Sequence, residues 1–457
     1  MKSYTYARRA GGRFGALHPV RGAEQATPAV FPQVSGALDW LLGGALGHMP
    51  QSEDAFQLSV FAPEAAQGLP VMVFLPGGAF VSGAGTVRWY DATQFAEQQQ
   101  CVVVTVNYRI GLLAHAGAVG AGNLVPDDLL IALRWVRDHI AGHGGNADNV
   151  TLVGQSAGAF WAFALAQLPA AAGLFRRAAL MSLAWEPPLG GAEAAKRQRI
   201  VDEALAGADP ETVPVEDLLG AQAEVARAWA GRGLGLLPTA DGQVPSDLFD
   251  VQAAVGRLHV DELLLTHNAD EAAAFLGPAP EAAFEETGLE GFLAAQFADP
   301  DASAGYLRAE LPGASPKIRM IRAMTLHQIE LYATELADAA VAAGKSVTTV
   351  RFDVRSSLPN AGAAHCFELP FLFNNLDRWC DAPMLEGIPE HVFNFAAGEL
   401  GALVGGFVRA GAPVTSSRSP VPRYLPDTGS LHVIAAEGIR QIEPERRHHA
   451  RRSGVHA

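Results

Sequence analysis

One short segment constrains the fold of this chain more than any other. Residues 154–158 read Gly-Gln-Ser-Ala-Gly, between the apolar runs 150–153 and 159–165. The β-branched run before the segment predicts a buried strand, and the Ala- and Phe-rich run after it predicts a buried helix. Glycines on both sides of Ser156 permit a sharp turn with little side-chain bulk nearby. The segment therefore predicts a strand, a tight turn and a helix, with the serine at the tip of the turn.

A serine in this setting is typical of a nucleophile elbow. The N-terminus of the following helix carries positive potential, which favours the oxyanion that forms when a serine attacks a carbonyl carbon. A five-residue match occurs often by chance, and the alternative is an ordinary Gly/Ser turn. The strand before the match and the helix after it favour the nucleophile.

Composition excludes several other classes of protein. The 457 residues are 49% hydrophobic and 18% charged, with a formal net charge of −15, which argues against a nucleic acid or an anionic membrane surface as partner. We expect no membrane span, because no run of about 18 uninterrupted apolar residues occurs. The N-terminus lacks the apolar core of a signal peptide, so we expect a cytoplasmic protein. Three cysteines give no disulfide framework, and no spacing predicts a metal or a nucleotide cofactor.

Short strands alternate with longer helical segments along the chain. Runs rich in β-branched residues predict strands at 71–75, 102–106, 150–153, 178–181, 263–266 and 347–352. Apolar residues at helical spacing predict a helix from about 127 to 141. This alternation is typical of an α/β fold with a central, mostly parallel sheet and helices on both faces. We expect a single domain with helical insertions at 186–260 and 276–345 over the active site, and a flexible tail at 440–457.

A nucleophilic serine needs a base, and the base needs a carboxylate that orients it. Both partners should follow strands, because the carboxyl ends of parallel strands meet at one edge of a sheet. The fifth predicted strand runs into His267, Asp270 and Glu271, and the loop after the sixth contains His365. The usual chain order favours Glu271 as acid and His365 as base. Two alternatives stay open at this point, namely Asp270 as the acid and His267 as the base.

The oxyanion also needs hydrogen-bond donors. One should be the backbone N–H of Ala157, directly after the nucleophile. The others should come from the Pro-Gly-Gly-Ala-Phe loop at 76–80, which follows the first predicted strand. Paired glycines permit close backbone approach and positive φ, so we predict Gly78 and Ala79 as donors. The alternative is an ordinary Gly-Gly turn.

An apolar substrate pocket is expected beside these loops. Phe80, Phe160 and Trp161 adjoin the predicted catalytic loops in sequence, although each taken alone is more typical of a core residue. No basic cluster lies near the motifs, so a neutral ester is favoured over an acidic substrate.

Together these motifs resemble those of the type B carboxylesterase family, which includes the cholinesterases, from about Arg13 to Leu431. The similar segments are 52–60, 76–80, 107–111, 154–158, 268–271 and 364–370, matching the family's Ser-Glu-Asp, His-Gly-Gly-Gly-Phe, Asn-Tyr-Arg-x-Gly, Gly-x-Ser-x-Gly, Asn-x-Asp-Glu and His-Gly-x-Glu-Leu-Pro motifs. The resemblance implies an α/β-hydrolase fold with Ser156, Glu271 and His365 as the catalytic triad. It implies a serine carboxylesterase that acts on a small-molecule ester through an acyl-enzyme and uses no cofactor.

The chain departs from the family at several positions. Pro76 replaces a histidine or tyrosine, while Ala79 and Cys366 replace glycines and add bulk beside the acyl pocket and the base. Met-Ser-Leu-Ala at 181–184 replaces Gln-Ser-Gly-Ser, so we expect a polar group near the triad to be missing. Little room is expected before Arg13 for the hairpin that opens the family's fold.

The resemblance also implies two structural ion pairs, Arg13 with Glu53 and Arg109 with Asp128, beneath the site. Other functions stay open. The same triad serves lactone opening, amide or carbamate cleavage and acyl transfer, and sequence does not choose among them. A non-catalytic binding protein is disfavoured by the complete set of serine, glutamate and histidine. The oligomeric state is not indicated by the sequence.

Overall fold

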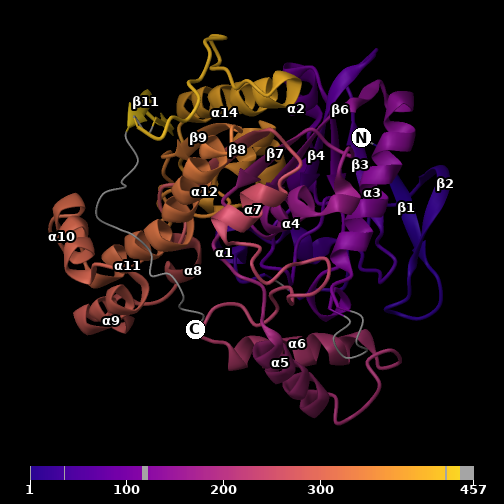
Figure 1. Cartoon of the computed structure of the whole chain (residues 1–457), viewed down its shortest axis with the longest axis horizontal. Coiled ribbons are helices and arrows are strands. Elements are labelled where there is room, and N and C mark those ends of the chain that lie inside the picture. The colour runs from indigo at the N-terminus through magenta and orange to yellow at the C-terminus, as the bar shows by residue number, and fades with distance from the viewer. Residues whose placement is uncertain (1, 35, 116–121, 428–429, 443–457) are drawn as a thin grey trace.

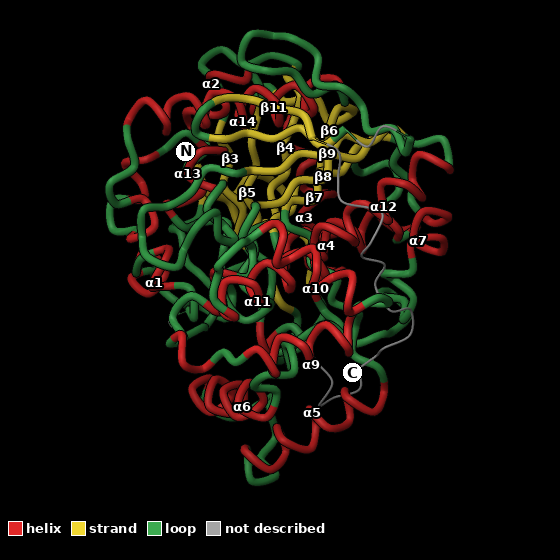
Figure 2. The backbone as a smooth tube through the Cα atoms, turned by 90° about the vertical axis from the view of Figure 1, so that its left-hand side faces the viewer, coloured by secondary structure: helices red, strands yellow, loops and turns green. Residues whose placement is uncertain are grey.

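The computed structural model describes residues 2–34, 36–115, 122–427 and 430–442. Within these ranges an 11-stranded sheet forms the centre, in the order β11-β10-β9-β8-β7-β6-β4-β5-β3-β1-β2 (Figures 1 and 2). The strands are β1 (Lys2–Arg9), β2 (Leu17–Gln25), β3 (Gln57–Phe61), β4 (Leu69–Leu75), β5 (Val102–Val106), β6 (Gly145–Gln155), β7 (Arg177–Met181), β8 (Glu262–Asn268), β9 (Ser346–Phe352), β10 (Leu431–Ala435) and β11 (Gly438–Ile442). The central strands from β5 to β10 pair in parallel, and the outer pairs are antiparallel. The predicted α/β architecture is therefore confirmed.

The central strands are buried on both faces, so alternate residues enter two separate cores. In β4, Val71, Val73 and Leu75 belong to one core, and Met72 and Phe74 belong to the other. Helices that contribute to the first core are α3 (Val125–His139), α4 (Ala157–Gln167), α5 (Gly191–Ala204), α6 (Val215–Ala228), α7 (Val251–Arg257) and α12 (Leu331–Ala342). Helices that contribute to the second are α1 (Asp39–Leu42), α2 (Thr93–Gln99), α8 (Ala273–Leu276), α13 (Leu369–Phe373) and α14 (Glu390–Ala410).

Helix α14 is the core helix of the second face. Among the described residues, α14 is the one helix that is long and apolar enough to cross a membrane. However, 78% of its apolar 18-residue stretch is buried inside the fold. It packs on β4, β6 and β10 and on α13 and α2. Its apolar composition is explained by this packing, because a helix surrounded by a sheet and other helices is apolar on most sides.

Helix α3 begins and ends close to the predicted bounds. Pro126 stands in its first turn, where a fixed φ suits the helix and the missing N–H costs nothing. Acidic Asp127 and Asp128 lie in the first turn, and Arg137 and His139 lie in the last, so these charges match the helix dipole.

Helices occur in both ranges predicted as insertions, α5, α6 and α7 in the first and α9 to α12 in the second. Helices α9 (Glu286–Gln296), α10 (Pro300–Glu310) and α11 (Pro316–Thr325) form a group beside the sheet with its own small core (Figure 1). Asp299 and Ser315 cap α10 and α11 by accepting backbone N–H bonds, and proline follows each cap. At the other end of the chain, residues 440–442 of the predicted tail belong to β11, and 443–457 lie outside the described residues.

The expectation that the opening hairpin lacks room was wrong. β1 and β2 pair as an antiparallel hairpin that begins at Lys2, with Arg9 opposite Leu17. Arg13 lies in the turn rather than after the hairpin, and the eight residues Lys2–Arg9 suffice for the first strand. Arg13 Nε lies 2.7 Å from Glu53, as the resemblance implied.

The second implied ion pair is also present. Arg109 Nη2 lies 2.5 Å from Asp128 Oδ1, and the two side chains are 3% and 0% exposed. Asp128 also accepts the backbone N–H of Arg109. The pair ties α3 to the loop after β5 beneath the site, and its loss would leave an unpaired buried charge.

Candidate active site

The strands that carry the candidate residues end together at one edge of the sheet. Gln155 of β6 pairs with Met181 of β7, and Met181 pairs with Thr266 of β8. Asn268, at the end of β8, pairs with Phe352 of β9. The loops that follow β6, β8 and β9 carry the predicted serine, acid and base. Parallel register therefore brings together residues that are more than two hundred positions apart.

Ser156 occupies the sharp turn that the sequence predicted. Its φ of 57° and ψ of −124° lie in a region that residues other than glycine rarely adopt. A Cβ atom at Gly154 would lie 2.1 Å from the Gly158 carbonyl oxygen, and one at Gly158 would lie 2.0 Å from that of Leu75. Both glycines are thus required by close backbone approach, and helix α4 starts directly after the serine.

Glu271 and His365 meet in the interior of this edge. Glu271 Oε2 lies 2.5 Å from His365 Nδ1, and the residues are 1% and 3% exposed. Burial opposes ionisation of Glu271, but the charge and hydrogen bond of His365 hold its pKa below the usual value. Burial likewise opposes the charge on His365, but Cys366 and Glu271 raise the pKa of His365 well above its usual value. The carboxylate is placed to fix the imidazole tautomer and to stabilise an imidazolium.

The second oxygen of Glu271 is also fully engaged. Its Oε1 accepts hydrogen bonds from Ser182 Oγ at 2.6 Å and from the Asn268 backbone N–H at 2.7 Å. The expectation that a polar group is missing here was therefore wrong. The residues around Ser182 in the segment 181–184 differ from the family's, but the serine itself is present. Ser182 has a φ of 52°, which turns the chain beneath the carboxylate.

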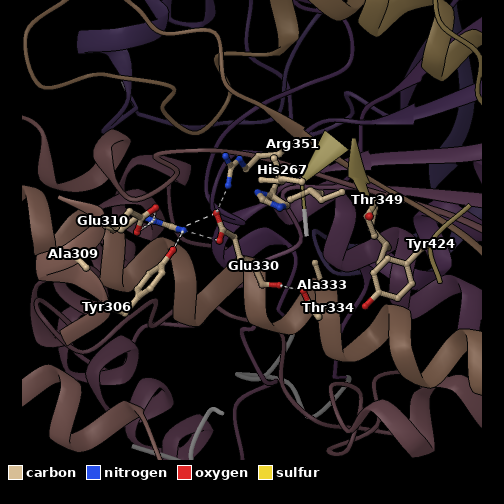
Figure 3. A pocket seen from close by; sticks show the side chains of 14 residues that line it. His267, Tyr306, Ala309, Glu310, Glu330, Ala333, Thr334, Thr349, Arg351 and Tyr424 are labelled. Atoms are coloured by element: carbon tan, nitrogen blue, oxygen red, sulfur yellow. Dashed lines mark hydrogen bonds and ion pairs between the residues drawn. The ribbon is translucent and has the colours of Figure 1, made fainter. Parts of the chain in front are cut away.

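The two alternatives from sequence are placed elsewhere. Asp270 accepts the Ala363 backbone N–H at 2.9 Å and pairs with Arg355 at 2.6 Å, so it ties the acid loop to the base loop. His267 lines a separate cavity of about 330 Å³, in which it lies beside Arg351 and Glu330 (Figure 3). Neither side chain makes the carboxylate–imidazole contact that Glu271 makes with His365.

The outer nitrogen of His365 faces an amide. Gln155 Nε2 lies 3.5 Å from His365 Nε2, and within the described ranges no hydrogen bond joins that nitrogen to Ser156 Oγ. A Cβ atom at Gly77 would lie 2.7 Å from Ser156 Cβ and 2.6 Å from Gln155 Oε1, so the serine and the amide lie side by side. Proton transfer from Ser156 to His365 therefore requires the hydroxyl to reach Nε2 when substrate binds, as hydrogen bonds in empty active sites often tighten on binding.

The predicted oxyanion loop has an unusual backbone. Gly78, Ala79 and Phe80 have φ values of 138°, 52° and 65°, a run of positive φ that strains the two non-glycine residues. The backbone N–H groups of Gly78, Ala79 and Ala157 donate to no other residue that the structure describes. Free donors on a strained loop opposite a helix N-terminus suit an oxyanion.

The aromatic residues predicted for the pocket lie in the core. Phe80 packs edge-on against Phe160 at 5.2 Å and against Trp161 at 6.2 Å, and none of the three is more than 6% exposed. Sequence reasoning missed Phe275, which is 53% exposed and has its ring 5.5 Å from that of His365. The available signal was its position four residues, about one helical turn, after Glu271.

Sequence reasoning also missed a second buried carboxyl group. Glu368 is 2% exposed, and its Oε2 accepts a hydrogen bond from Asn268 Nδ2 at 2.5 Å. Burial and then the charge of Glu271 raise the pKa of Glu368 to about 7. The signal in the sequence was the Glu-Leu-Pro end of the motif at 364–370.

In the described parts of the chain, no group of three or more His, Cys, Asp or Glu side chains is placed to hold a metal ion. A second cavity, of about 460 Å³, is lined by polar residues such as Asp270 and Arg355 and by apolar residues, and it shares Glu310, Arg322 and Arg351 with the first cavity. Neither Ser156 nor His365 lines these two cavities.

Known proteins share the fold of this chain and resemble it in sequence. The parallel sheet and the strained serine between strand and helix define an α/β-hydrolase. Residues 21–202 match the Carboxylesterase family. The chain is 33% identical to a probable N-octanoylanthranilate hydrolase of Rhodococcus erythropolis, over 90% of this chain and 87% of that one, and 31% identical to a phenmedipham hydrolase of Pseudarthrobacter oxydans, over 86% and 81%.

Solved structures give the same result over nearly the whole chain. A PNB esterase superposes with a TM-score of 0.76 at 29% identity, over 96% of this chain and 93% of that one. A carboxylesterase of Geobacillus stearothermophilus superposes with a TM-score of 0.80 at 28% identity, over 96% and 94%. The chain belongs to the carboxylesterase family, related to PNB esterase and the cholinesterases.

Proposed function

We propose that this chain is a serine hydrolase that cleaves neutral carboxylic esters through an acyl-enzyme on Ser156. One observation carries the proposal: the buried Glu271–His365 contact lies at the sheet edge where the strained serine turn ends β6. A carboxylate on one imidazole nitrogen and a serine beside the other are the parts that acyl transfer needs.

Each group has a defined task in the reaction. His365 Nε2 accepts the proton of Ser156 as Oγ attacks the ester carbonyl, and Glu271 stabilises the imidazolium that results. The N–H groups of Gly78, Ala79 and Ala157 receive the oxyanion. His365 then protonates the leaving alcohol, and a water activated by the same imidazole releases the acid. Before attack, the Gln155 amide must give up its place at Nε2 to the serine hydroxyl.

The surroundings support a neutral substrate with an apolar group. Glu271 and Glu368 contribute carboxyl groups near the base. The pKa of Glu271 is lowered, so its carboxylate is ionised and would repel an anionic substrate. Phe275 presents an exposed aromatic face beside His365, where a flat leaving group would stack.

Amide cleavage is the second candidate function. Its support is the relative named for N-octanoylanthranilate, in which an acyl group is joined to an aromatic amine. Ester and amide cleavage use the same nucleophile and base, and they differ in how readily the leaving group is expelled.

A fluorophosphonate probe tests the nucleophile. We expect one covalent adduct on Ser156, found by peptide mass spectrometry, and none in Ser156→Ala. The matched control is Ser59→Ala, whose hydroxyl bonds Ser3 at 2.9 Å, away from the site. A folded wild-type protein that takes no probe would contradict the serine-hydrolase proposal and favour a binding function.

Paired substrates test the reaction class. Octanoate and acetate esters of p-nitrophenol are compared with the corresponding p-nitroanilides, in wild type and in Ser156→Ala. Ester turnover that greatly exceeds anilide turnover supports an esterase, and the reverse order supports an amidase. Turnover that persists in Ser156→Ala would assign the chemistry to another group.

A further inference from the structure

The residue after the proposed base is a thiol held in a strained position. Cys366 has a φ of 73°, in the left-handed region where glycine is favoured. The family motif that residues 364–370 resemble has glycine at this position. A residue with a Cβ atom costs roughly 1–2 kcal/mol in that conformation. The thiol is 6% exposed.

The thiol belongs to one cluster with the proposed base and its acid. Gln155 Nε2 lies 3.4 Å from Cys366 Sγ and 3.5 Å from His365 Nε2, so sulfur and imidazole share a neighbour. Cys366 also directly follows His365 in the chain, and its position beside the imidazole raises the pKa of His365. A thiol beside an imidazole that is backed by a carboxylate can pass its proton to that imidazole and become a nucleophilic thiolate.

An unpartnered polar atom points to a group that this cluster receives. Gln155 is fully buried, and its Oε1 has no hydrogen-bond partner among the described residues. Buried amide oxygens normally have a donor, and this oxygen belongs to the same amide whose Nε2 contacts the Cys366 thiol. A sulfenic acid on Cys366 carries an O–H donor, and the Gln155 Oε1 of the neighbouring amide is an acceptor without a partner among the described residues.

We propose that Cys366 is an oxidation site at which a hydroperoxide converts the thiol to a sulfenic acid that blocks His365 and stops the chemistry of Ser156. The part about Ser156 rests on the proposed function. The Cys366 proton passes to His365, and the sulfur attacks one peroxide oxygen. The S–O bond forms as the O–O bond breaks, and the leaving hydroxide takes the proton from His365 and becomes water. Sulfur loses two electrons and the peroxide gains them.

The other cysteines serve as internal comparisons. Cys101 is fully buried at the start of β5, and burial raises the pKa of its thiol to about 12, so it should resist oxidation. Cys380 is exposed but lies in a different segment of the chain. Cys380→Ser therefore removes the accessible thiol outside the cluster.

The test treats the full chain with hydrogen peroxide and measures two independent quantities. One is hydrolysis of p-nitrophenyl butyrate, and the other is dimedone labelling of each cysteine by mass spectrometry. We expect dimedone on Cys366 and a loss of turnover of about 100-fold, the lower end of what a general base contributes. Dithiothreitol should restore turnover and reduce the Cys366 sulfenic acid that dimedone labels.

Variants decide whether the loss runs through Cys366. In Cys366→Gly the ratio of treated to untreated turnover should stay near one, whereas Cys380→Ser should lose activity as wild type does. Cys366→Ser provides the same comparison without the change of backbone freedom. Equal inactivation of wild type and both Cys366 variants would overturn the proposal, as would dimedone confined to Cys380.

The two proposals fail in different ways. A protein that binds no fluorophosphonate and cleaves no ester, but carries dimedone on Cys366 after peroxide, refutes the hydrolase and supports the oxidation site. A hydrolase that keeps full activity with an unlabelled Cys366 refutes the oxidation site alone.

Discussion

Glu271 Oε2 and His365 Nδ1 lie 2.5 Å apart, although the two residues stand 94 positions apart in the chain. Register between β8 and β9 aligns the strand ends, and the backbone N–H of His365 also donates to the Glu271 carbonyl at 3.3 Å. The contact between acid and base is thus supported at the level of both backbone and side chain. The predictions below depend on it.

The activity should rise with pH through a pKa above that of a free histidine. His365 must be neutral to accept the Ser156 proton, and its pKa is raised well above its usual value, so the base stays protonated past about pH 6.5. We expect kcat/KM for a p-nitrophenyl ester to follow this titration. Glu271→Gln removes one cause of the raised pKa, so its profile should move to lower pH while kcat falls by up to about 10⁴-fold. Identical profiles would show that Glu271 does not act on the base.

Ser182→Ala should impair both stability and turnover. The variant removes a buried hydrogen bond to an ionised carboxylate, which contributes about 1.5–3 kcal/mol, and frees Glu271 to move from the imidazole. The matched control is Ser59→Ala, because Ser59 is fully buried and bonds Ser3 at 2.9 Å, away from the site. Urea unfolding should report losses in both variants, but kcat should fall only in Ser182→Ala. A normal kcat in Ser182→Ala would give the hydrogen bond a purely structural role.

Phe275→Ala should weaken substrate binding without unfolding the protein. The ring is 53% exposed, so the free energy of unfolding should change by less than about 0.5 kcal/mol. Loss of aromatic stacking of about 0.5–1.5 kcal/mol should raise KM for aryl esters by about 2- to 10-fold. Leu425→Ala, at 54% exposure, is the control for removing an exposed apolar side chain. An equal KM in both variants would exclude Phe275 from the binding surface.

Glu368 should make stability fall as pH rises. Its pKa is about 7 in the folded protein, and an unfolded glutamate titrates near pH 4.3, so the folded state binds more protons between these values. The free energy of unfolding therefore decreases across this range as pH rises. In Glu368→Gln this decline should be weaker, measured by urea unfolding at a series of pH values. The prediction is contradicted by parallel pH dependences in wild type and variant.

The serine turn could be predicted from sequence because its causes are local. Gly154 and Gly158 are required by backbone atoms that approach within the same strand–turn–helix unit or from the adjoining strand. Strand positions were predictable for a similar reason, since a buried parallel strand needs a continuous apolar run. Chain order and the resemblance supplied the acid and the base, but order alone left Asp270 and His267 open.

Tertiary structure decided everything that depends on the direction of a side chain. Asp270 and Glu271 are neighbours, yet one binds the backbone of the base loop and the other binds His365. Ser182 on the carboxylate and the exposed Phe275 beside the imidazole depend on strand register and on how α8 sits over the loop, and no local pattern encodes them.

The sequence by itself determined the sheet, the nucleophile turn and the residue types of the site, because hydrophobic periodicity and glycine sterics act over a few residues. The packing of distant loops determined which atoms meet. In particular it set the Gln155 amide, and not the Ser156 hydroxyl, beside His365 Nε2, and it brought the Cys366 thiol into the same cluster. Such contacts depend on how segments distant in sequence are placed relative to one another, and only the folded chain sets that placement.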